Sequence, residues 1–590
     1  MQPPTLTIGN DGFYHPSNEI ELIALVKKAA FENLEVRCRG AAHSMSRAIY
    51  TDAGLASQAI KNIVSMQVPP MGPNLNIMLD NYNRLVWIDE EKGIIEVEAG
   101  IHLGFDPEDP TGSSTLENSL LFQAFKKGFT LSDLGGISHQ TVSGFLMTGS
   151  AGGSLQYSID ENIEAISMID GNGELENFTK DHEYFNAIIL SLGLLGVVSK
   201  VRLKLTPNFN ICGKQSTYLT NQQTVQDSKN SKIPIDLFGC GTVERPGLEN
   251  FLLSTPYARI LWWPQLKVTK MVIWEAARVT PIIDFTPLPY EQFDKDKLLT
   301  YIEQLAASML FTILGNNKFF NVWEKLRPSF VEFKKAINKL WGDNLLSKFT
   351  AEIITFVLKV IFFVISYLFT NFKWLAKLLY APIINLLQPI KNGSNAQLFR
   401  DYAYSGLPMD NEANDIMLGT EFTEIWIPLS NTSAAMKLLD KMFTEGKYSS
   451  TGYYSTELYA GKKSRNWLSP AYNTDVFRID FFWFTTNDCN PAISDGFFDQ
   501  FWKALKKEGI PFRLHWAKYL PEYDYEDWSS YFRKQYPKWD DFMNLRKKRD
   551  PNNIFLTNYW SLHLFGKSKY PKEGDNQKLN YPHHSSLSVD

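Results

Sequence analysis

The sequence predicts an α+β protein in which helices and antiparallel hairpins form at least two structural units. Its 590 residues exceed what one hydrophobic core usually supports. The hydrophobic share of 44% and the charged share of 21% are typical of a globular chain. The first part of the chain mixes a helix with hairpins, whereas the later part changes to longer strands, many aromatic residues and apolar helices.

The elements predicted for the first part follow from residue patterns. Residues 18–33 form an amphipathic helix with an asparagine cap and acidic residues in its first turn. Residues 34–40 form a short strand, and residues 83–104 and 164–178 form hairpins. Residues 193–207 contain a helix end, a glycine bend and an alternating strand that a proline terminates.

The second part contains a long apolar helical region at about 298–389. Within it, residues 353–369 carry a single charge, Lys359, and residues 372–380 are amphipathic and basic. The apolar run is shorter than the roughly 20 residues that a spanning helix needs. Three alternatives remain open for it: a helix that dips into one leaflet, a buried helix of a substrate domain, and a true span.

Composition excludes several classes of function. A net charge of −5 and a pI near 6.1 argue against nucleic-acid binding. The four cysteines, which are scattered without a pair motif, predict a reducing compartment without disulfides, and the nine histidines show no metal-ligand spacing. The first residues lack a basic region and an apolar core, so we expect an intracellular protein without a signal peptide.

Two segments rich in small residues, 36–46 and 135–153, are candidates for a phosphate site. Neither a G-x-G-x-x-G fingerprint at the first strand–helix junction nor a P-loop is present. Bare backbone N–H groups can nevertheless converge on an anion, so the two segments together could hold a pyrophosphate. Two ordinary glycine-rich turns are the alternative.

A series of motifs, in this order, resembles one protein family. The motifs are VRCRGAAHS (36–44), VEAGIHLG (97–104), LSDLGGISHQTVSGFLMTGSAGG (131–153), GLLGVVSKVRLKLTP (193–207), FTEIWIPLSN (422–431), RLHWAKYLPEYDYEDW (513–528) and LRKKRDPNNIFLTNYW (545–560). They resemble the vanillyl-alcohol oxidase-type flavoproteins, whose FAD-binding domain is of the PCMH type. The likeness is strongest to the aldonolactone oxidases, the group that includes L-gulonolactone oxidase.

The resemblance implies FAD as cofactor, bonded covalently through His43 to the flavin 8α-methyl group. A tether of this kind tunes the redox potential and prevents loss of the cofactor. The other positions that match FAD contacts are Arg39, Gly40, Ala41, Ala42, Ser44, Ser46, Gly135, Gly136, Ser138, Thr141, Gly144, Thr148, Gly149, Gly196, Val197 and Val198.

The resemblance also suggests catalytic residues. His515 and Lys518 match a His-Trp-x-Lys motif, in which the lysine is the cation beside the reduced flavin. The alternatives are that Lys518 is a surface lysine and that His515 is a histidine at the end of a strand. Glu457 matches the glutamate of a Glu-x-Arg signature, but Tyr459 stands where arginine is expected. Both side chains should share one face of a strand, unless this is an exposed edge strand.

Because the arginine of the family signature is absent, the sequence does not determine the identity of the substrate. Lys462, Lys463 or Arg465 are candidates to replace its charge.

The expected function is an oxidase that converts a CH–OH group of an alcohol or lactone into a carbonyl, with O2 as acceptor and hydrogen peroxide as product. In this family a glycine at the position of Gly135 leaves room for O2. The alternatives are an oxidase of a lipophilic alcohol such as a sterol, a dehydrogenase with another acceptor, and a flavin-binding protein whose catalysis has decayed. The apolar run resembles that of the microsomal gulonolactone oxidases, which implies membrane association, with contact through residues 353–380.

Together these inferences divide the chain into domains. We expect a PCMH-type FAD-binding domain at 1–210 and an α+β substrate domain at 211–545 with an antiparallel sheet and the apolar helical insertion. Residues 546–565 are expected to return to the FAD domain, and the polar tail at 566–590 to be disordered.

Overall fold

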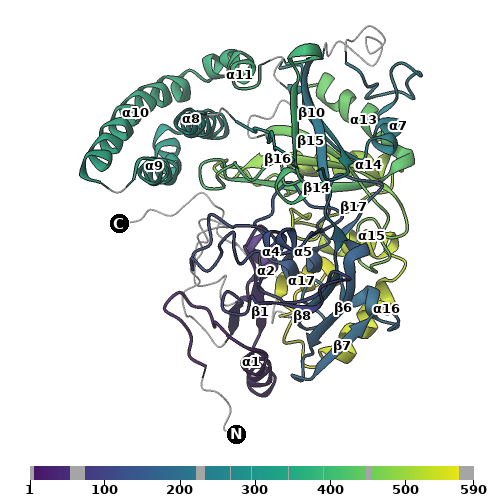
Figure 1. The fold of residues 1–590 in the computed structure, drawn as a ribbon. Coiled ribbons are helices and arrows are strands. Elements are labelled where there is room, and N and C mark those ends of the chain that lie inside the picture. Colours follow the sequence, from purple (N-terminus) through teal and green to yellow (C-terminus); the bar gives the residue numbers. More distant parts are fainter. Residues whose placement is uncertain are drawn as a thin grey trace.

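The computed structural model consists of two sheet-containing halves, with a group of helices beside one of them (Figure 1). It describes residues 6–52, 74–220, 233–265, 268–282, 284–293, 296–342, 344–389, 391–446 and 453–570. The tail predicted to be disordered lies, from residue 571 on, outside the described residues.

The N-terminal half contains an antiparallel five-stranded sheet and a parallel strand pair. The sheet has the order β3 (Leu85–Asp89), β4 (Ile94–Glu98), β8 (Val197–Lys204), β6 (Ile163–Ile169) and β7 (Leu175–Thr179). The parallel pair is β1 (Val36–Arg39) with β2 (Leu75–Met78), and β5 (Phe129–Thr130) pairs with β9 (Thr206–Pro207). The helices are α1 (Glu19–Glu32), α2 (Ser46–Ile49), α4 (Leu120–Lys126), α5 (Val142–Thr148) and α6 (Phe185–Ile188).

The first helix illustrates how local sequence sets these elements. The side chain of Asn18 accepts a hydrogen bond from the backbone N–H of Glu21, which caps α1. The helix ends at Asn33, whose φ of 53° is left-handed. Its buried residues Leu22, Leu25 and Ala29 follow helical spacing and pack into the main core.

The second half is built on an antiparallel eight-stranded sheet. Its order is β13 (Gln397–Tyr402), β10 (Asn210–Leu219), β12 (Lys270–Val279), β11 (Tyr257–Trp263), β15 (Tyr453–Gly461), β16 (Val476–Phe484), β14 (Thr420–Pro428) and β17 (Arg513–Leu514). The accompanying helices are α7 (Leu248–Ser254), α12 (Ala403–Gly406), α13 (Thr432–Thr444) and α14 (Phe497–Lys507).

A group of long helices lies to one side of the eight-stranded sheet (Figure 1). Its members are α8 (Lys297–Gly315), α9 (Phe319–Trp341), α10 (Leu345–Asn371) and α11 (Lys373–Leu387). A separate hydrophobic cluster joins them to the sheet, because Trp263, Val272 and Phe484 pack with residues of α8, α9 and α11. By length and composition α8 and α10 could each cross a membrane, but buried core helices pass the same test.

The C-terminal segment returns to the N-terminal half. It forms α15 (Tyr525–Gln535), α16 (Trp539–Arg549) and α17 (Asn558–Phe565), and Figure 1 shows α16 beside β7 and α17 among the helices of the N-terminal half. Val36 donates a backbone hydrogen bond to the carbonyl of Ile554 at 2.8 Å. The backbone N–H of Asn558 donates to the carboxylate of Asp52 at 2.8 Å. One continuous hydrophobic core therefore runs through both halves, while the exact domain limits remain a prediction.

Candidate functional site

Two cavities meet between the halves of the molecule. The first lies in the N-terminal half, and the second extends toward the eight-stranded sheet with a volume of about 340 Å³. Residues that line both cavities are His43, Gln140, Ser150, His515 and Lys518. This junction contains three of the residues that the sequence singled out for chemistry.

Lys518 and His515 are held at the junction by backbone contacts. Nζ of Lys518 donates a hydrogen bond to the carbonyl oxygen of His43 at 2.9 Å, and burial lowers the pKa of Lys518. The backbone N–H of Ala517 donates to Nδ1 of His515, so the hydrogen of this neutral ring is on Nε2. Burial also lowers the pKa of His515 to about 4. The alternative of a surface lysine is therefore wrong, whereas His515 does stand at a strand end, directly after β17 (Arg513–Leu514), where it is buried and lines both cavities.

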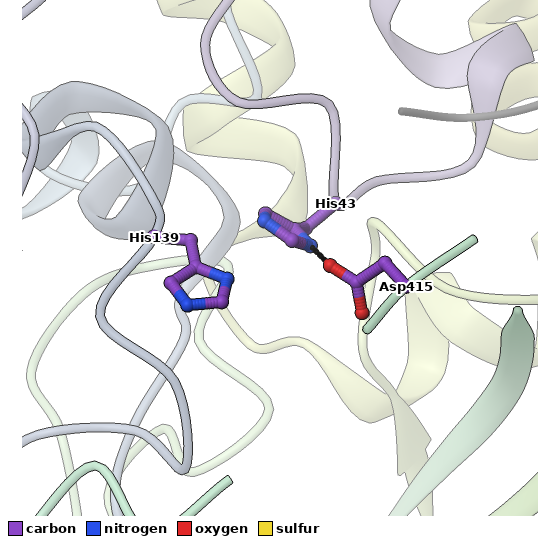
Figure 2. Close-up of side chains that lie close together, drawn as sticks. All are labelled: His43, His139 and Asp415. Carbon is purple, nitrogen blue, oxygen red and sulfur yellow. Dashed lines mark ion pairs between the residues drawn. The ribbon is translucent and has the colours of Figure 1, made fainter. Parts of the chain in front are cut away.

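His43 has two polar neighbours that the sequence did not reveal (Figure 2). Its Nδ1 lies 3.7 Å from Oδ2 of Asp415, and its ring centroid lies 5.8 Å from that of His139. The nitrogen and oxygen atoms of the three side chains lie within 4.8 Å of one another, close enough for a metal ion. No spacing rule could predict this group, because its members come from three separate segments.

Most residues predicted to contact the cofactor line the first cavity. They are Arg39, Gly40, Ala41, Ala42, His43, Ser44, Thr141, Gly144, Thr148, Gly196, Val197 and Val198. Ser46, Gly135 and Gly136 line the second cavity instead. Ser138 and Gly149 line neither, because Ser138 bonds Asn411 through its N–H and hydroxyl, and Gly149 caps the end of α5.

The small residues near His43 also have a packing role. A Cβ on Gly40 would lie only 2.3 Å from Oγ1 of Thr141, so a larger residue would separate the two small-residue segments. Ala42 has a φ of 62°, the left-handed region, which a bulky side chain would rarely adopt. Close approach between two loops, as well as room for a ligand, therefore requires small residues here.

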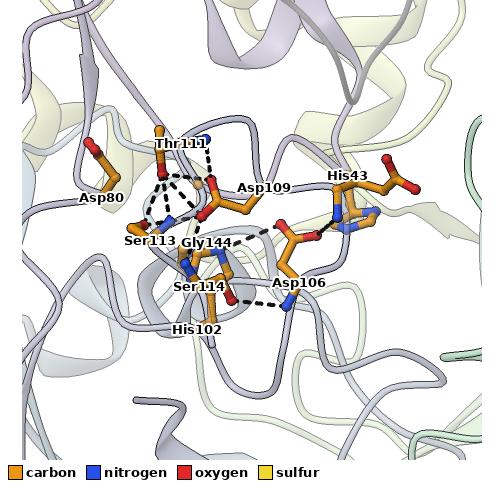
Figure 3. A network of polar contacts seen from close by, with 12 residues as sticks. His43, Asp80, His102, Asp106, Asp109, Thr111, Ser113, Ser114 and Gly144 are labelled. Atoms are coloured by element: carbon orange, nitrogen blue, oxygen red, sulfur yellow. Dashed lines mark hydrogen bonds and ion pairs between the residues drawn. The ribbon is translucent and has the colours of Figure 1, made fainter. Parts of the chain in front are cut away.

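Acidic residues line part of the first cavity, and polar partners hold them (Figure 3). Asp80 accepts a hydrogen bond from His15 at 2.6 Å, which raises the pKa of that imidazole to about 9. Asp109 accepts hydrogen bonds from the backbone of Thr111 and Ser114. Such carboxylates suit the hydroxyl groups of a nucleotide better than its phosphates.

Glu457 and Tyr459 lie on one face of β15 and line the second cavity. Both are buried, and β15 lies between β11 and β16, so the alternative of an exposed edge strand is wrong. Burial raises the pKa of Glu457 to about 8; Asp410 acts in the same direction and Arg259 against it. Nε of Arg259 lies 3.7 Å from the Glu457 carboxylate, and its guanidinium also pairs with Asp410.

The second cavity is lined by arginines of the strands on either side of β15, Arg259 and Arg478, and not by Lys462, Lys463 or Arg465. Lys462 instead bonds the carbonyl of Gln156, and none of the three lines either cavity. Alternation along β15 could not reveal these two arginines, because they lie on strands that pair with β15 through long-range register.

Arg478 on β16 pairs in register with Tyr459, and its guanidinium carbon lies 4.9 Å from the phenol ring centroid. It pairs with Glu424 at 2.6 Å and donates to the carbonyls of Ala151 and Gly152. With Arg259 on β11, it gives the second cavity two buried guanidinium groups.

The second cavity also has apolar and aromatic lining residues beside further polar ones such as Gln292, Glu421 and Asp480. The apolar members of its lining include Leu261, Val272, Phe293, Met409, Ile416, Leu418, Phe422, Phe482 and Phe484. Lys518 lies over the ring of Phe422, 4.1 Å from its centroid. The cavity thus combines an ionisable floor at Glu457 with an apolar wall, which suits a ligand that has both a hydroxyl group and carbon surface.

Comparisons with known proteins agree with the motifs. The family described as D-arabinono-1,4-lactone oxidase matches residues 317–563. D-arabinono-1,4-lactone oxidase of Candida albicans is 26% identical over 282 residues, which are 47% of this chain and 42% of that protein. L-gulonolactone oxidase of Scyliorhinus torazame is 22% identical over 552 residues, 93% of each chain. The match to the Candida protein thus spans less than half of that protein's length.

Solved structures confirm the predicted fold class. A cholesterol oxidase from Brevibacterium sterolicum superposes with a TM-score of 0.57 at 12% identity, covering 96% of this chain and 99% of the other. A second cholesterol oxidase structure gives 0.56 at 13% identity. The resemblance inferred from the motifs is confirmed by the sequence relatives, and the structural likeness shows the fold alone.

Proposed function

We propose that this chain, which resembles the aldonolactone oxidases among the vanillyl-alcohol oxidase-type flavoproteins, is an FAD-dependent oxidase of a CH–OH group. The substrate is an aldonolactone or a related polyol, the acceptor is O2, and the products are a carbonyl compound and hydrogen peroxide. The observation that carries the proposal is the junction of the two cavities at His43, His515 and Lys518.

The residues of the first cavity fit FAD. FAD would be held by the small-residue segments that line this cavity, and His43 at the junction would form its covalent tether. Support comes from Nε2 of His43, which is buried without a hydrogen-bond partner among the described residues. FAD bound there accepts a hydride from the substrate, and O2 then takes up the electrons to give hydrogen peroxide.

The residues of the second cavity supply the remaining chemistry. Glu457 in its ionised form accepts the hydroxyl proton of the substrate, and the N–H on Nε2 of His515 binds a substrate oxygen. Lys518 stabilises negative charge that develops at the junction during hydride transfer. Gly135 leaves space for O2: a Cβ there would lie 3.4 Å from the ring of Phe145, an ordinary contact distance.

A substrate panel tests this function. Purified protein is mixed with aldonolactones, polyols and sterols, and peroxide release is measured beside a Glu457→Gln control. We expect peroxide with at least one lactone or polyol and a loss of roughly 100-fold or more in the control. Flavin that is reduced anaerobically but not reoxidised by O2 would indicate a dehydrogenase. No reduction by any alcohol would indicate a binding protein.

A lipophilic alcohol is the second candidate substrate. The apolar wall of the second cavity favours it, because a polyhydroxylated ligand would leave that wall without complementary contacts. In the same panel, turnover of sterols without turnover of lactones would replace the first proposal with this one.

We further propose that α10 inserts into one leaflet of a membrane. Its buried stripe consists of Ala351, Thr355, Phe362, Ser366 and Thr370, four of which are small or hydroxylated. Its exposed surface carries Leu345, Leu346, Phe349, Phe356 and Val360. Only 22% of its most apolar 18-residue window is buried, which favours a membrane contact over a buried helix. Apolar residues outside and polar ones inside are the reverse of a helix in water.

A further inference from the structure

The carboxylate of Asp415 forms an ion-pair contact with the imidazole ring of His43, although it comes from the other half of the molecule. Oδ2 of Asp415 lies 3.7 Å from Nδ1 of His43, and Figure 2 shows the two groups pointing toward each other. Oδ2 of Asp415 has no hydrogen-bond partner among the described residues. Asp415 also lines the second cavity, so its carboxylate faces the space at the junction.

The segment that carries Asp415 is fixed at both ends. The backbone N–H of Asp410 donates to the carbonyl of Gly136 at 2.7 Å, and that of Ser138 donates to the side chain of Asn411 at 2.9 Å. The backbone N–H of Asn414 donates to Gln304 of α8 at 2.8 Å. The segment is therefore clamped between the small-residue loop and the helical group, which holds the carboxylate in place.

We propose that Asp415 is the positioning residue that enables covalent attachment of the flavin to His43. This inference rests on the proposed tether. Attachment joins an imidazole nitrogen to the flavin methyl carbon. One C–H bond and one imidazole N–H bond break, one C–N bond forms, and O2 takes the two electrons and two protons to give hydrogen peroxide. Asp415 stabilises the positive charge that develops on the imidazole and receives its N–H proton.

The surroundings of His43 suit this role. Burial lowers the pKa of His43 to about 4, so the ring is neutral and its nitrogen lone pair is free to react. Asp106 opposes this shift, whereas Lys518, His102 and Arg39 add to it. Burial also lowers the pKa of His139 to about 4, so this neighbour brings no competing cation. Burial raises the pKa of Asp415, which makes its ionised carboxylate a stronger proton acceptor, and this carboxyl group is the one in contact with the ring.

The experiment follows attachment in the full-length protein after FAD is added to flavin-free material in air. Non-covalent binding is measured by quenching of flavin fluorescence, and covalent binding by the flavin that stays with acid-precipitated polypeptide. We expect Asp415→Asn to bind FAD non-covalently but to attach it on the order of 100-fold more slowly. Glu412→Gln is the matched control, because this exposed residue of the same segment pairs with Lys297 away from the cavities.

The outcomes separate this inference from the tether itself. Attachment in Asp415→Asn at the rate of the unmodified chain would overturn the role of Asp415 alone. If Asp415→Asn fails to fold, Asp415→Glu, which keeps the carboxylate, should attach flavin faster than Asp415→Ala, which removes it; equal rates in the two variants would overturn the inference. Unmodified protein whose flavin is fully extractable, or that holds one divalent metal ion in place of covalent flavin, would overturn both proposals.

Discussion

Glu457 is a carboxyl group whose surroundings set the pH at which it can act as a base. Burial raises its pKa to about 8, so it is protonated at neutral pH and becomes a proton acceptor as the pH rises past that value. We therefore expect the rate of flavin reduction by substrate to increase with pH through about 8. Glu457→Gln should be slower by roughly 100-fold or more and should lose this pH dependence. Stopped-flow absorbance measures both, with the exposed Glu161→Gln as control; an unchanged profile in Glu457→Gln would remove the base role.

The two charged neighbours of Glu457 should shift this profile in opposite directions. Asp410 raises the pKa of Glu457 and Arg259 lowers it. Asp410→Asn should therefore move the apparent pKa of flavin reduction below about 8, and Arg259→Met should move it above. The same stopped-flow titration checks both variants. A shift in the same direction for the two would show that another group titrates.

Some residues of the site could be predicted from the sequence and others could not. Glu457, His515 and Lys518 could be predicted as cavity residues because motif order and strand alternation fix them. Arg478 could not, because it faces Tyr459 only through the register of β15 with β16. Asp415 was missed for the same reason: its contact with His43 spans the two halves, and no local pattern records such a contact.

At the scale of elements, the pairing of β14 with β16 contains one buried cation, Arg478. Arg478 pairs with Glu424, and Asp480 lies 3.5 Å from its guanidinium. Arg478→Met would leave two buried carboxyl groups without their cation, so we expect a loss of about 3–5 kcal/mol in the free energy of unfolding. Lys462→Met, on the exposed end of the same region, should change it by no more than about 0.5 kcal/mol. Chemical denaturation measures both, and equal stabilities would contradict the role given to Arg478.

The proposed insertion of helix α10 predicts that its exposed apolar residues are needed for binding to membranes. Phe356 and Val360 are exposed, and replacing both with glutamate puts charge where the leaflet would lie. We expect the unmodified chain to co-sediment with phosphatidylcholine vesicles and the double variant to bind on the order of 100-fold more weakly. Ile20→Glu with Phe31→Glu on α1 is the matched control, since these side chains are at least as exposed as Phe356 and Val360. If the double variant of α10 co-sediments with the vesicles as strongly as the α1 control, the proposed insertion of α10 is contradicted.

For the elements, periodicity predicted the capped first helix, the hairpins and the apolar helical region. It could not tell which face of α10 is buried, because apolar residues occur all around this helix. Only the packing of small and hydroxylated residues against α9 and α8 identifies the inner stripe.

At the scale of the whole molecule, function depends on how the two halves meet. The α+β class and the resemblance could be predicted, because seven motifs occur in a fixed order along the chain. The junction of the cavities could not, because it brings together residues as distant in sequence as His43 and Lys518. Long-range hydrogen bonds and one continuous core hold this arrangement.

The central claim is that the chain binds FAD in the first cavity and that His43 forms a covalent bond to its flavin. An absorbance spectrum of the acid-precipitated, washed polypeptide tests it directly. We predict that the yellow flavin spectrum stays with the unmodified polypeptide and that flavin becomes extractable in His43→Ala, whose fold is retained. A colourless protein that takes up no added FAD would contradict the account, and flavin that remains bonded in His43→Ala would contradict the assignment of His43.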